Sequence, residues 1–229
     1  MQSKAKIDRI IKNSLDAHNK YKLFSSYKRN KLLRKLSKKL ILNKSIIINT
    51  ISKEISKTIN DAETEFNRAL RTIDFGAEET LRIYGKVYPC DIFADEIQKK
   101  AYVGKVPLGI ILAVTPYNFP LNIPLHKIIP ALSTGNAIIF KPSPLGKKTA
   151  NLIQKLVIEC GFPKNILQTI HCSDSFLQKL LLEEKINMVS YTGSSLFGKK
   201  IRSISNISKI NLEMGGNNPL IIMKDANLH

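Results

Sequence analysis

The spacing of apolar side chains divides the chain into a helical first part and a second part in which strands alternate with helices. In residues 1–45, apolar side chains recur three and four positions apart, as on one face of a helix: Ile7, Ile10, Ile11 and Leu15, then Leu32, Leu33, Leu36 and Leu40. The helical pattern continues from Ile46 to Arg82, and within it Glu65 falls among the polar positions. We predict that residues 1–84 are N-terminal helices, and that the last, Thr58 to Tyr84, is a scaffold helix without catalytic residues.

Helical spacing stops between Gly85 and Lys105. Two short apolar groups, broken by Pro89 and Asp91, predict the two strands of a β-hairpin: Val87, Tyr88, Ile92, Phe93, Ala101, Tyr102 and Val103. A hairpin this far from the later strands has unpaired edges. We therefore expect residues 85–105 to protrude and to pair with another subunit.

From residue 106 onward, apolar runs alternate with helical segments. The run from Gly109 to Val114 is continuous, which is typical of a parallel strand buried on both faces. Further strands are expected at Ala137–Phe140, Ile166–Ile170, Met188–Tyr191 and Lys209–Leu212. Helices are expected at Asn122–Leu132, Lys148–Cys160 and Ser175–Lys185, and from Leu196 on. The predicted fold class is α/β: residues 106–229 form a Rossmann-like, doubly wound parallel sheet, with the N-terminal helices and the protruding hairpin added to it.

Charge adds one question to this picture. The net charge of +18 could indicate a nucleic-acid or membrane-surface partner, and the Lys-rich N-terminus could be a nucleic-acid arm or an organellar presequence. The lysines are dispersed, Asp8 and Asp16 interrupt the basic N-terminus, and no nucleic-acid-binding motif accompanies them. We therefore favour solvated helix faces, and expect no membrane partner and no nucleic-acid partner.

The three cysteines, Cys90, Cys160 and Cys172, are widely separated and odd in number, which disfavours a disulfide framework or a zinc site. No signal-peptide core and no run of roughly 18 apolar residues is present. These features together predict a cytoplasmic protein without a bound metal.

The stretch from Asn187 to Pro219 concentrates the candidate chemistry. A strand, the small-residue turn Thr192–Ser195 and a helix start form an anion-binding arrangement, because the first N–H groups of a helix lack internal partners. Glu213 ends the next strand, where open α/β sheets place their chemistry. The pattern predicts a nucleotide cofactor at Gly193 and Ser194 and a general base at Glu213. The ordinary alternatives are a helix start capped by serine and a glutamate paired with a lysine.

Two residues at the ends of earlier strands could complete such a site. Asn118 lies in a turn fixed by two prolines, and its amide could donate to an oxyanion or merely bond within the turn. Lys141 follows the next strand, where the ribose of an adenosine would lie, although it could equally be one of many solvated lysines.

Five motifs in this order and spacing resemble the N-terminal, cofactor-binding half of the aldehyde dehydrogenase superfamily: Thr-Pro-Tyr-Asn-Phe-Pro-Leu (115–121), Gly-Asn-Ala-Ile-Ile-Phe-Lys-Pro-Ser (135–143), Gly-Phe-Pro (161–163), Tyr-Thr-Gly-Ser-Ser-Leu-Phe-Gly (191–198) and Leu-Glu-Met-Gly-Gly-Asn-Asn-Pro (212–219). The helical region from Lys57 to Pro89 is similar to members that oxidise lactaldehyde or succinate semialdehyde, and to non-phosphorylating glyceraldehyde-3-phosphate dehydrogenases.

The resemblance implies oxidation of an aldehyde to a carboxylic acid with NAD or NADP, in a protein that forms homo-oligomers when full-length. It makes Asn118 the oxyanion donor and Glu213 the general base, a partly buried carboxylate with a raised pKa. It also implies a set of cofactor-binding residues: Thr115, Tyr117, Lys141, Ser143, Gly193, Ser194 and Gly198.

The chain departs from the family pattern in three places. Many members have Glu where this chain has Pro144, which leaves NAD and NADP both open, and His171–Asp174 replaces a glycine-rich turn. The family's nucleophilic cysteine should follow Glu213, yet all three cysteines precede it. We therefore expect the catalytic cysteine domain to be absent and this chain alone to be inactive. The alternatives are a free-standing nucleotide-binding remnant and a basic nucleic-acid-binding protein.

Overall fold

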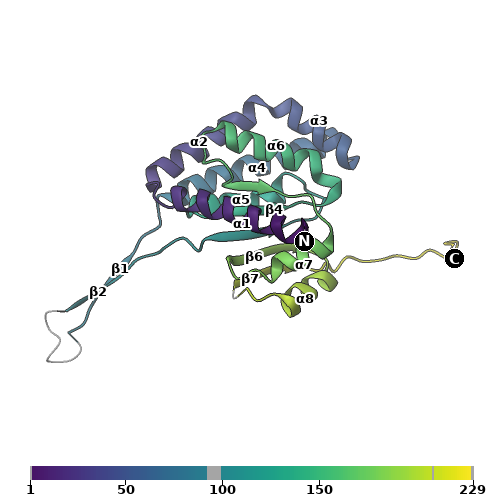
Figure 1. Cartoon of the computed structure of the whole chain (residues 1–229). Coiled ribbons are helices and arrows are strands. Elements are labelled where there is room, and N and C mark those ends of the chain that lie inside the picture. Colours follow the sequence, from purple (N-terminus) through teal and green to yellow (C-terminus); the bar gives the residue numbers. More distant parts are fainter. Residues whose placement is uncertain (1, 92–98, 208, 228–229) are drawn as a thin grey trace.

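The computed structural model describes residues 2–91, 99–207 and 209–227 (Figure 1). Its centre is a five-stranded parallel sheet with the strand order β5-β4-β3-β6-β7. The strands are β3 (Ile110–Val114), β4 (Ala137–Lys141), β5 (Leu167–Thr169), β6 (Ile186–Gly193) and β7 (Lys209–Met214). The chain builds outward from β3 to one edge, then returns to build from β6 to the other. The strand order thus reverses between β3 and β6, the point at which open α/β sheets bind ligands.

Strand β3 is apolar throughout because helices cover both of its faces. All of its residues are buried. Ile111 and Ala113 pack into the core beneath helices α2 to α6. Ile110, Leu112 and Val114 pack into the opposite core, with α1, α7 and α8. Alternate side chains of a strand point to opposite faces, so a strand between two helix layers has no polar positions.

The first layer consists of α2 (Ser26–Leu42), α3 (Lys44–Ile55), α4 (Ile59–Thr80), α5 (Asn122–Ser133) and α6 (Lys147–Glu159). The second consists of α7 (Asp174–Leu181), α8 (Ser195–Ile204) and the first half of α1 (Gln2–Tyr21). Tyr21, at the end of α1, belongs to the first core, and its hydroxyl donates to the Leu132 carbonyl at 2.9 Å. Helix α1 therefore links the two layers.

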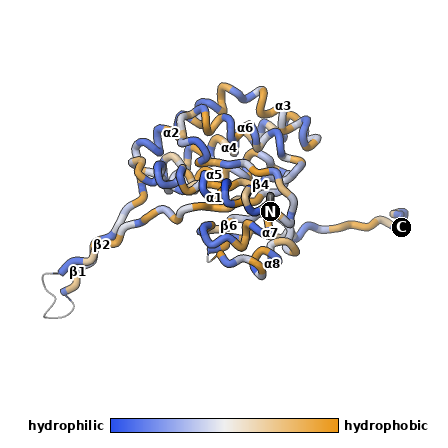
Figure 2. The backbone as a smooth tube through the Cα atoms, viewed as in Figure 1, coloured by the Kyte–Doolittle hydropathy of each residue, from blue (hydrophilic) through white to orange (hydrophobic). Residues whose placement is uncertain are grey.

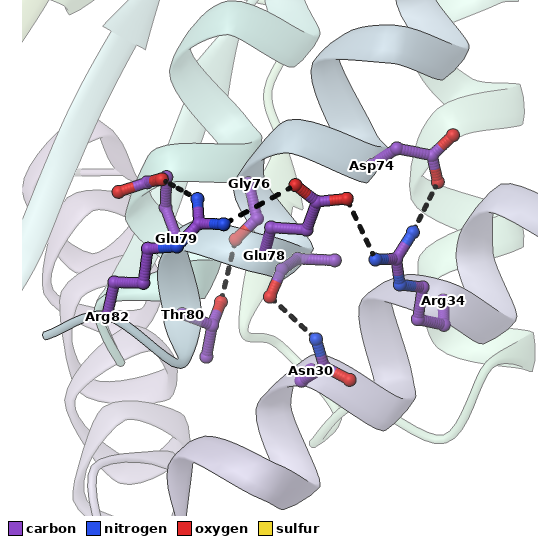
Figure 3. Close-up of polar contacts among 9 residues, drawn as sticks. Asn30, Arg34, Asp74, Gly76, Glu78, Glu79, Thr80 and Arg82 are labelled. Atoms are coloured by element: carbon purple, nitrogen blue, oxygen red, sulfur yellow. Dashed lines mark hydrogen bonds and ion pairs between the residues drawn. The ribbon is translucent and has the colours of Figure 1, made fainter.

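Helices α2 and α4 are joined by polar contacts around their buried apolar faces (Figure 3). Arg34 of α2 bonds Asp74 at 3.2 Å and Glu78 at 3.3 Å, and Asn30 donates to the Ala77 carbonyl at 2.6 Å. The ion pairs are largely exposed, so each stabilises the fold by only about 0–1 kcal/mol. The buried apolar face of α4 supplies most of the stability of this contact.

The hairpin lies outside this body (Figure 1). Strands β1 (Lys86–Pro89) and β2 (Lys100–Val103) pair with each other in antiparallel register, and every residue in them is exposed. The expected strand residues Ile92 and Phe93 fall outside the described residues.

After β7 the chain leaves the body in an extended segment with an apolar stretch (Figures 1 and 2). Leu220, Ile221, Ile222 and Met223 are 85%, 79%, 60% and 66% exposed. No helix in the described part of the chain is long and apolar enough to cross a membrane.

The predicted fold class is confirmed, while several predicted bounds are wrong. The helical pattern from Ile46 to Arg82 is interrupted: α3 ends before Ser56, which has a left-handed φ of 54°, and Thr58 caps α4. Strand β6 extends through Thr192 and Gly193, which the sequence placed in a turn. Strand β6 is longer than predicted because it pairs with β7 as far as Gly193, which pairs with Met214.

Gly76 lies at the contact between helices α4 and α5. A β-carbon there would lie 2.2 Å from Ile129 Cγ2, a stiff branched side chain, and 3.1 Å from Ser133 Oγ. The Gly76 carbonyl also accepts the hydroxyls of Thr80 and Ser133 at 2.8 and 2.9 Å. This contact fixes α5, which lies against β3, relative to the N-terminal helices.

We predict that Gly76→Ala lowers the free energy of unfolding by about 1–2 kcal/mol, since overpacking outweighs the gain in helix propensity. Urea denaturation measures the change. Gly104→Ala is the matched control, because no atom lies within 4 Å of a β-carbon at that position. Equal stabilities of the two variants would contradict the close packing at Gly76.

Candidate functional site

The carboxyl ends of the five strands bring most of the predicted site residues to one edge of the sheet. Thr115 follows β3, Lys141 ends β4, Gly193 ends β6 and Glu213 is the next-to-last residue of β7. The Thr115 N–H donates to the Lys141 carbonyl at 3.3 Å, and Thr192 pairs with Glu213 across β6 and β7. The edge at the β3–β6 reversal therefore carries residues from four strands.

Glu213 is exposed, so the predicted partly buried carboxylate is wrong. Its Oε2 accepts the Thr192 hydroxyl at 2.8 Å, which aims the carboxylate along the strand ends. The difference follows from strand order, because β7 is an edge strand: Ile210 and Leu212 pack toward the core that includes α8, whereas Glu213 lies on the opposite, exposed side.

Asn118 lies in the turn after β3, and its side chain is exposed. The turn is held from α3 and α4 and not by bonds of the Asn118 amide, which has no hydrogen bond among the described residues. Lys57 Nζ donates to the Asn118 carbonyl at 2.7 Å and lies 3.9 Å from the centroid of the Phe119 ring. Glu65, fully buried, accepts the Leu121 and Asn122 N–H groups at 2.8 and 3.0 Å. Glu65, which the sequence pattern placed off the apolar face of α4, is therefore a buried residue.

Lys127 is a site residue that the sequence analysis missed. It lies on the buried side of α5, is 8% exposed, and its Nζ donates to Ser190 Oγ on β6 at 3.1 Å. Burial lowers the pKa of Lys127 to about 8, and the nearby Glu213 carboxylate partly opposes this shift. The available signal was a lysine at a core position of an apolar helix, but the chain has too many lysines for that signal to stand out.

The two glycines predicted to contact the cofactor pack closely against neighbouring side chains. A β-carbon at Gly193 would lie 2.3 Å from the Tyr191 hydroxyl, and one at Gly198 would lie 2.0 Å from Met214 Sδ. Tyr191 is buried, and its hydroxyl donates to the Ser194 carbonyl at 3.0 Å, whereas the flexible Met214 side chain is 40% exposed. Packing thus accounts for Gly193 better than for Gly198, and the contact of both with a cofactor stays a prediction.

Lys141 and His171 lie at the ends of β4 and β5, each beside polar partners. Lys141 Nζ is 3.6 Å from Asp174 Oδ1. Burial and the positive charge of Lys147 lower the pKa of His171, whose Nε2 is 2.8 Å from Asn151 Oδ1. Ser143 caps the turn that follows, accepting the Leu145 N–H at 3.4 Å.

Two features of this edge fit a dinucleotide. Thr115 is 4% exposed, and its hydroxyl has no hydrogen-bond partner in the described structure, which is costly for a buried polar atom. Ser194 caps α8 by accepting the Phe197 N–H, and Leu196 on the first turn of α8 is 84% exposed. A pyrophosphate can accept hydrogen bonds from the unpaired Thr115 hydroxyl and from the N–H groups at the start of α8. Tyr117 is 50% exposed on the same turn as Asn118.

The three cysteines are free and lie away from Glu213. Cys160 is buried after α6, Cys90 follows β1, and Cys172 follows β5. Strands β5 and β7 are four strand spacings apart, about 19 Å. Burial raises the pKa of both Cys160 and Cys172, which disfavours the thiolate. Within the described ranges, no three His, Cys, Asp or Glu side chains gather as metal ligands.

A large cavity of about 690 Å³ lies beside this site. It begins at Pro107 and Asn136, near the opposite ends of the strands, and reaches Lys127 and Ser190 under α5. The cavity lies between α5 and strands β3 and β6, and its lining also includes Asn211 of β7.

Fold and site together define a doubly wound α/β domain with an exposed amide after β3 and an exposed carboxylate near the end of β7. The chain belongs to the aldehyde dehydrogenase family, whose family model matches residues 1–229.

The relatives agree with this assignment. The chain is 37% identical over 204 residues to sulfoacetaldehyde dehydrogenase of Neptuniibacter caesariensis, covering 89% of this chain and 45% of that protein. It is 34% identical over 206 residues to lactaldehyde dehydrogenase of Methanococcus vannielii, covering 88% and 43%. The chain thus spans less than half the length of these relatives.

A solved structure, the NADP-dependent glyceraldehyde-3-phosphate dehydrogenase from Bacillus halodurans complexed with NADP, superposes with a TM-score of 0.90. Its sequence is 31% identical, and the match covers 98% of this chain and 48% of that one. The predicted resemblance to lactaldehyde and glyceraldehyde-3-phosphate dehydrogenases is confirmed.

The lowered pKa of Lys127 makes stability depend on pH in a defined direction. Between its folded pKa of about 8 and its ordinary value of 10.5, the unfolded chain binds the proton and the folded protein does not. Stability contributed by this group therefore rises with pH across that window, by up to about 1.4 kcal/mol per pH unit.

We predict that the free energy of unfolding of the wild-type protein, relative to Lys127→Met, increases by about 2 kcal/mol between pH 7.5 and 9.5. Urea denaturation of both proteins at both pH values gives the difference. The buried thiols and Tyr21 titrate in both proteins, so their contributions cancel. A difference independent of pH would show that Lys127 is not desolvated.

Proposed function

We propose that this chain is the cofactor-binding part of an NAD(P)-dependent enzyme that oxidises an aldehyde to a carboxylic acid. The observation that carries the proposal is the placement of Asn118 after β3 and of Glu213 near the end of β7, at the same edge of the sheet and within the five motifs. Strands β3 and β7 are two spacings apart, about 10 Å, which leaves room for a small substrate between these residues.

Asn118 donates its side-chain N–H to the aldehyde oxygen as negative charge develops there. A fixed donor of this kind typically lowers the barrier by about 3–4 kcal/mol. Its support is the exposed, unbonded amide on a turn whose backbone is held by Lys57. A bound dinucleotide supplies the acceptor for the hydride that leaves the substrate carbon.

Glu213 is the general base, accepting a proton from the water that releases the acid product. The hydroxyl of Thr192 orients its carboxylate. Lys127 contributes positive charge from beneath the strand ends, and its proton occupancy changes near pH 8. Lys127 and Glu213 lie along the same face of the strands, which supports a role for both at one substrate.

The nucleophilic thiol comes from polypeptide outside residues 1–229. Glu213 has no cysteine of this chain near it, and the relatives are about twice as long as the matched region. The exposed side of β7 and the apolar segment around Ile221 are the surfaces against which that polypeptide would pack. The exposed hairpin would pair with a second subunit, forming a homo-oligomer.

NADP is the preferred dinucleotide in this proposal. Pro144 stands where a carboxylate would repel a 2′-phosphate, Lys141 ends β4, and Lys147 lies at the start of the next helix. The one carboxylate paired with Lys141, on Asp174, is 68% exposed and free to move away. The resulting positive environment favours the additional phosphate charge.

We predict by calorimetry that the chain binds NADP⁺ more tightly than NAD⁺, and that Lys141→Met weakens NADP⁺ binding about tenfold, as expected for loss of a charged hydrogen bond. The control is Lys164→Met, which removes an exposed lysine that precedes β5 at the opposite end of the sheet. If both variants weakened NADP⁺ binding equally, the loss of affinity would be due to net charge and not to Lys141 itself. If neither dinucleotide gave a heat of binding, the cofactor role would be overturned.

We further predict that the chain alone produces no NADPH from lactaldehyde or glyceraldehyde 3-phosphate, followed as absorbance at the reduced nicotinamide. The reason is the separation between Glu213 and every thiol of the chain. If the chain produced NADPH, and still did so after Cys90, Cys160 and Cys172 were replaced by serine, the reaction would not need a thiol and the prediction would be wrong.

A further inference from the structure

The turn that carries Asn118 is anchored to a buried ion pair on the N-terminal helices. Lys57, in the link between α3 and α4, lies 2.7 Å from Glu65 Oε2 on α4. The Lys57 side chain is 13% exposed and that of Glu65 is fully buried. An ion pair removed from water is retained only when its remaining hydrogen-bonding capacity is satisfied.

The Asn118 turn satisfies the remaining hydrogen-bonding capacity of the Lys57–Glu65 pair. Both N–H groups that Glu65 Oε1 accepts, from Leu121 and Asn122, lie at the start of α5. Lys57 uses a second proton on the Asn118 carbonyl and covers the Phe119 ring. The pair therefore contacts the backbone on both sides of Pro120, and little freedom is left to the residues between.

A comparison within the same fold separates this arrangement from ordinary helix capping. Glu54 of α3 caps α6 from a distance, accepting the N–H groups of Lys148 and Thr149 and the Thr149 hydroxyl. Glu54 has no lysine partner among the described residues, and its helix start carries no predicted oxyanion donor. Capping alone needs only the carboxylate, so the added lysine serves the Asn118 carbonyl.

We propose that Lys57 and Glu65 are positioning residues that fix the Asn118 turn in the geometry needed to stabilise an oxyanion. This inference rests on the proposed role of Asn118. Lys57 sets the Asn118 carbonyl, Glu65 sets the start of α5, and the Asn118 side chain projects from a backbone held at both points. The site is thus organised in advance by residues that do not touch the substrate.

The test uses ¹⁵N relaxation of the backbone amides of Tyr117, Asn118 and Phe119 in the 229-residue chain. In the wild type we expect order parameters near 0.85, the value of rigid backbone, and in Lys57→Met values below about 0.6. Lys57→Met leaves a buried charge unpaired, so the double variant Lys57→Met/Glu65→Gln is measured beside it. The glutamine keeps an acceptor for the two N–H groups, and the turn should still loosen at Asn118.

Two further variants give the proposal its specificity. Lys57→Arg keeps the charge and can donate to both the carboxylate and the carbonyl, so it should restore the wild-type order parameters. Glu54→Gln disturbs a comparable cap at α6 and should leave residues 117–119 rigid. A rigid turn in the double variant, or equal loosening by Glu54→Gln, would overturn the positioning role.

NADP⁺ calorimetry on the same samples separates this proposal from the proposed function. If the wild type binds neither dinucleotide while the turn loosens as expected, the proposed function fails and with it the catalytic meaning of the anchor. If NADP⁺ binds and the turn stays rigid in the double variant, the positioning role alone fails.

Discussion

Burial of β3 on both faces is the constraint on which the rest of the structure depends. Its five apolar residues need one helix layer above and another below. The N-terminal helices and α5 supply the first, and α1, α7 and α8 supply the second. Because sheet growth proceeds from β3 in one direction and then in the other, its carboxyl end becomes the reversal point, and the turn of Asn118 leaves from there.

The sequence predicted the fold class and the edge of the sheet that carries the site. Prolines and glycines mark the strand ends so clearly that Thr115, Lys141 and Gly193 could be assigned to one edge from the sequence alone. Periodicity could not reveal that Glu65 and Lys127 are buried. Their burial depends on long-range contacts: Glu65 accepts the Leu121 N–H, 56 positions away, and Lys127 bonds Ser190, 63 positions away. Glu213 was misjudged for a related reason, since its exposure depends on β7 lying at the sheet's edge.

These residues form one part of a reaction site. In our proposal, the donor for an oxyanion, the base and the dinucleotide edge come from this chain, while the thiol comes from polypeptide outside it. Lys57 and Glu65 extend the site into helices that the motifs do not reach. The helical region is therefore more than a cover for the sheet, because it determines how rigidly the Asn118 turn is presented.

The most direct test of this account is to map the ¹H–¹⁵N chemical-shift changes caused by NADP⁺ across the 229-residue chain. The account predicts that the largest changes cluster at Thr115, Lys141, Gly193 and Ser194, along the carboxyl ends of the strands. Changes confined to the Lys-rich faces of α1 and α2, or none at all, would contradict it.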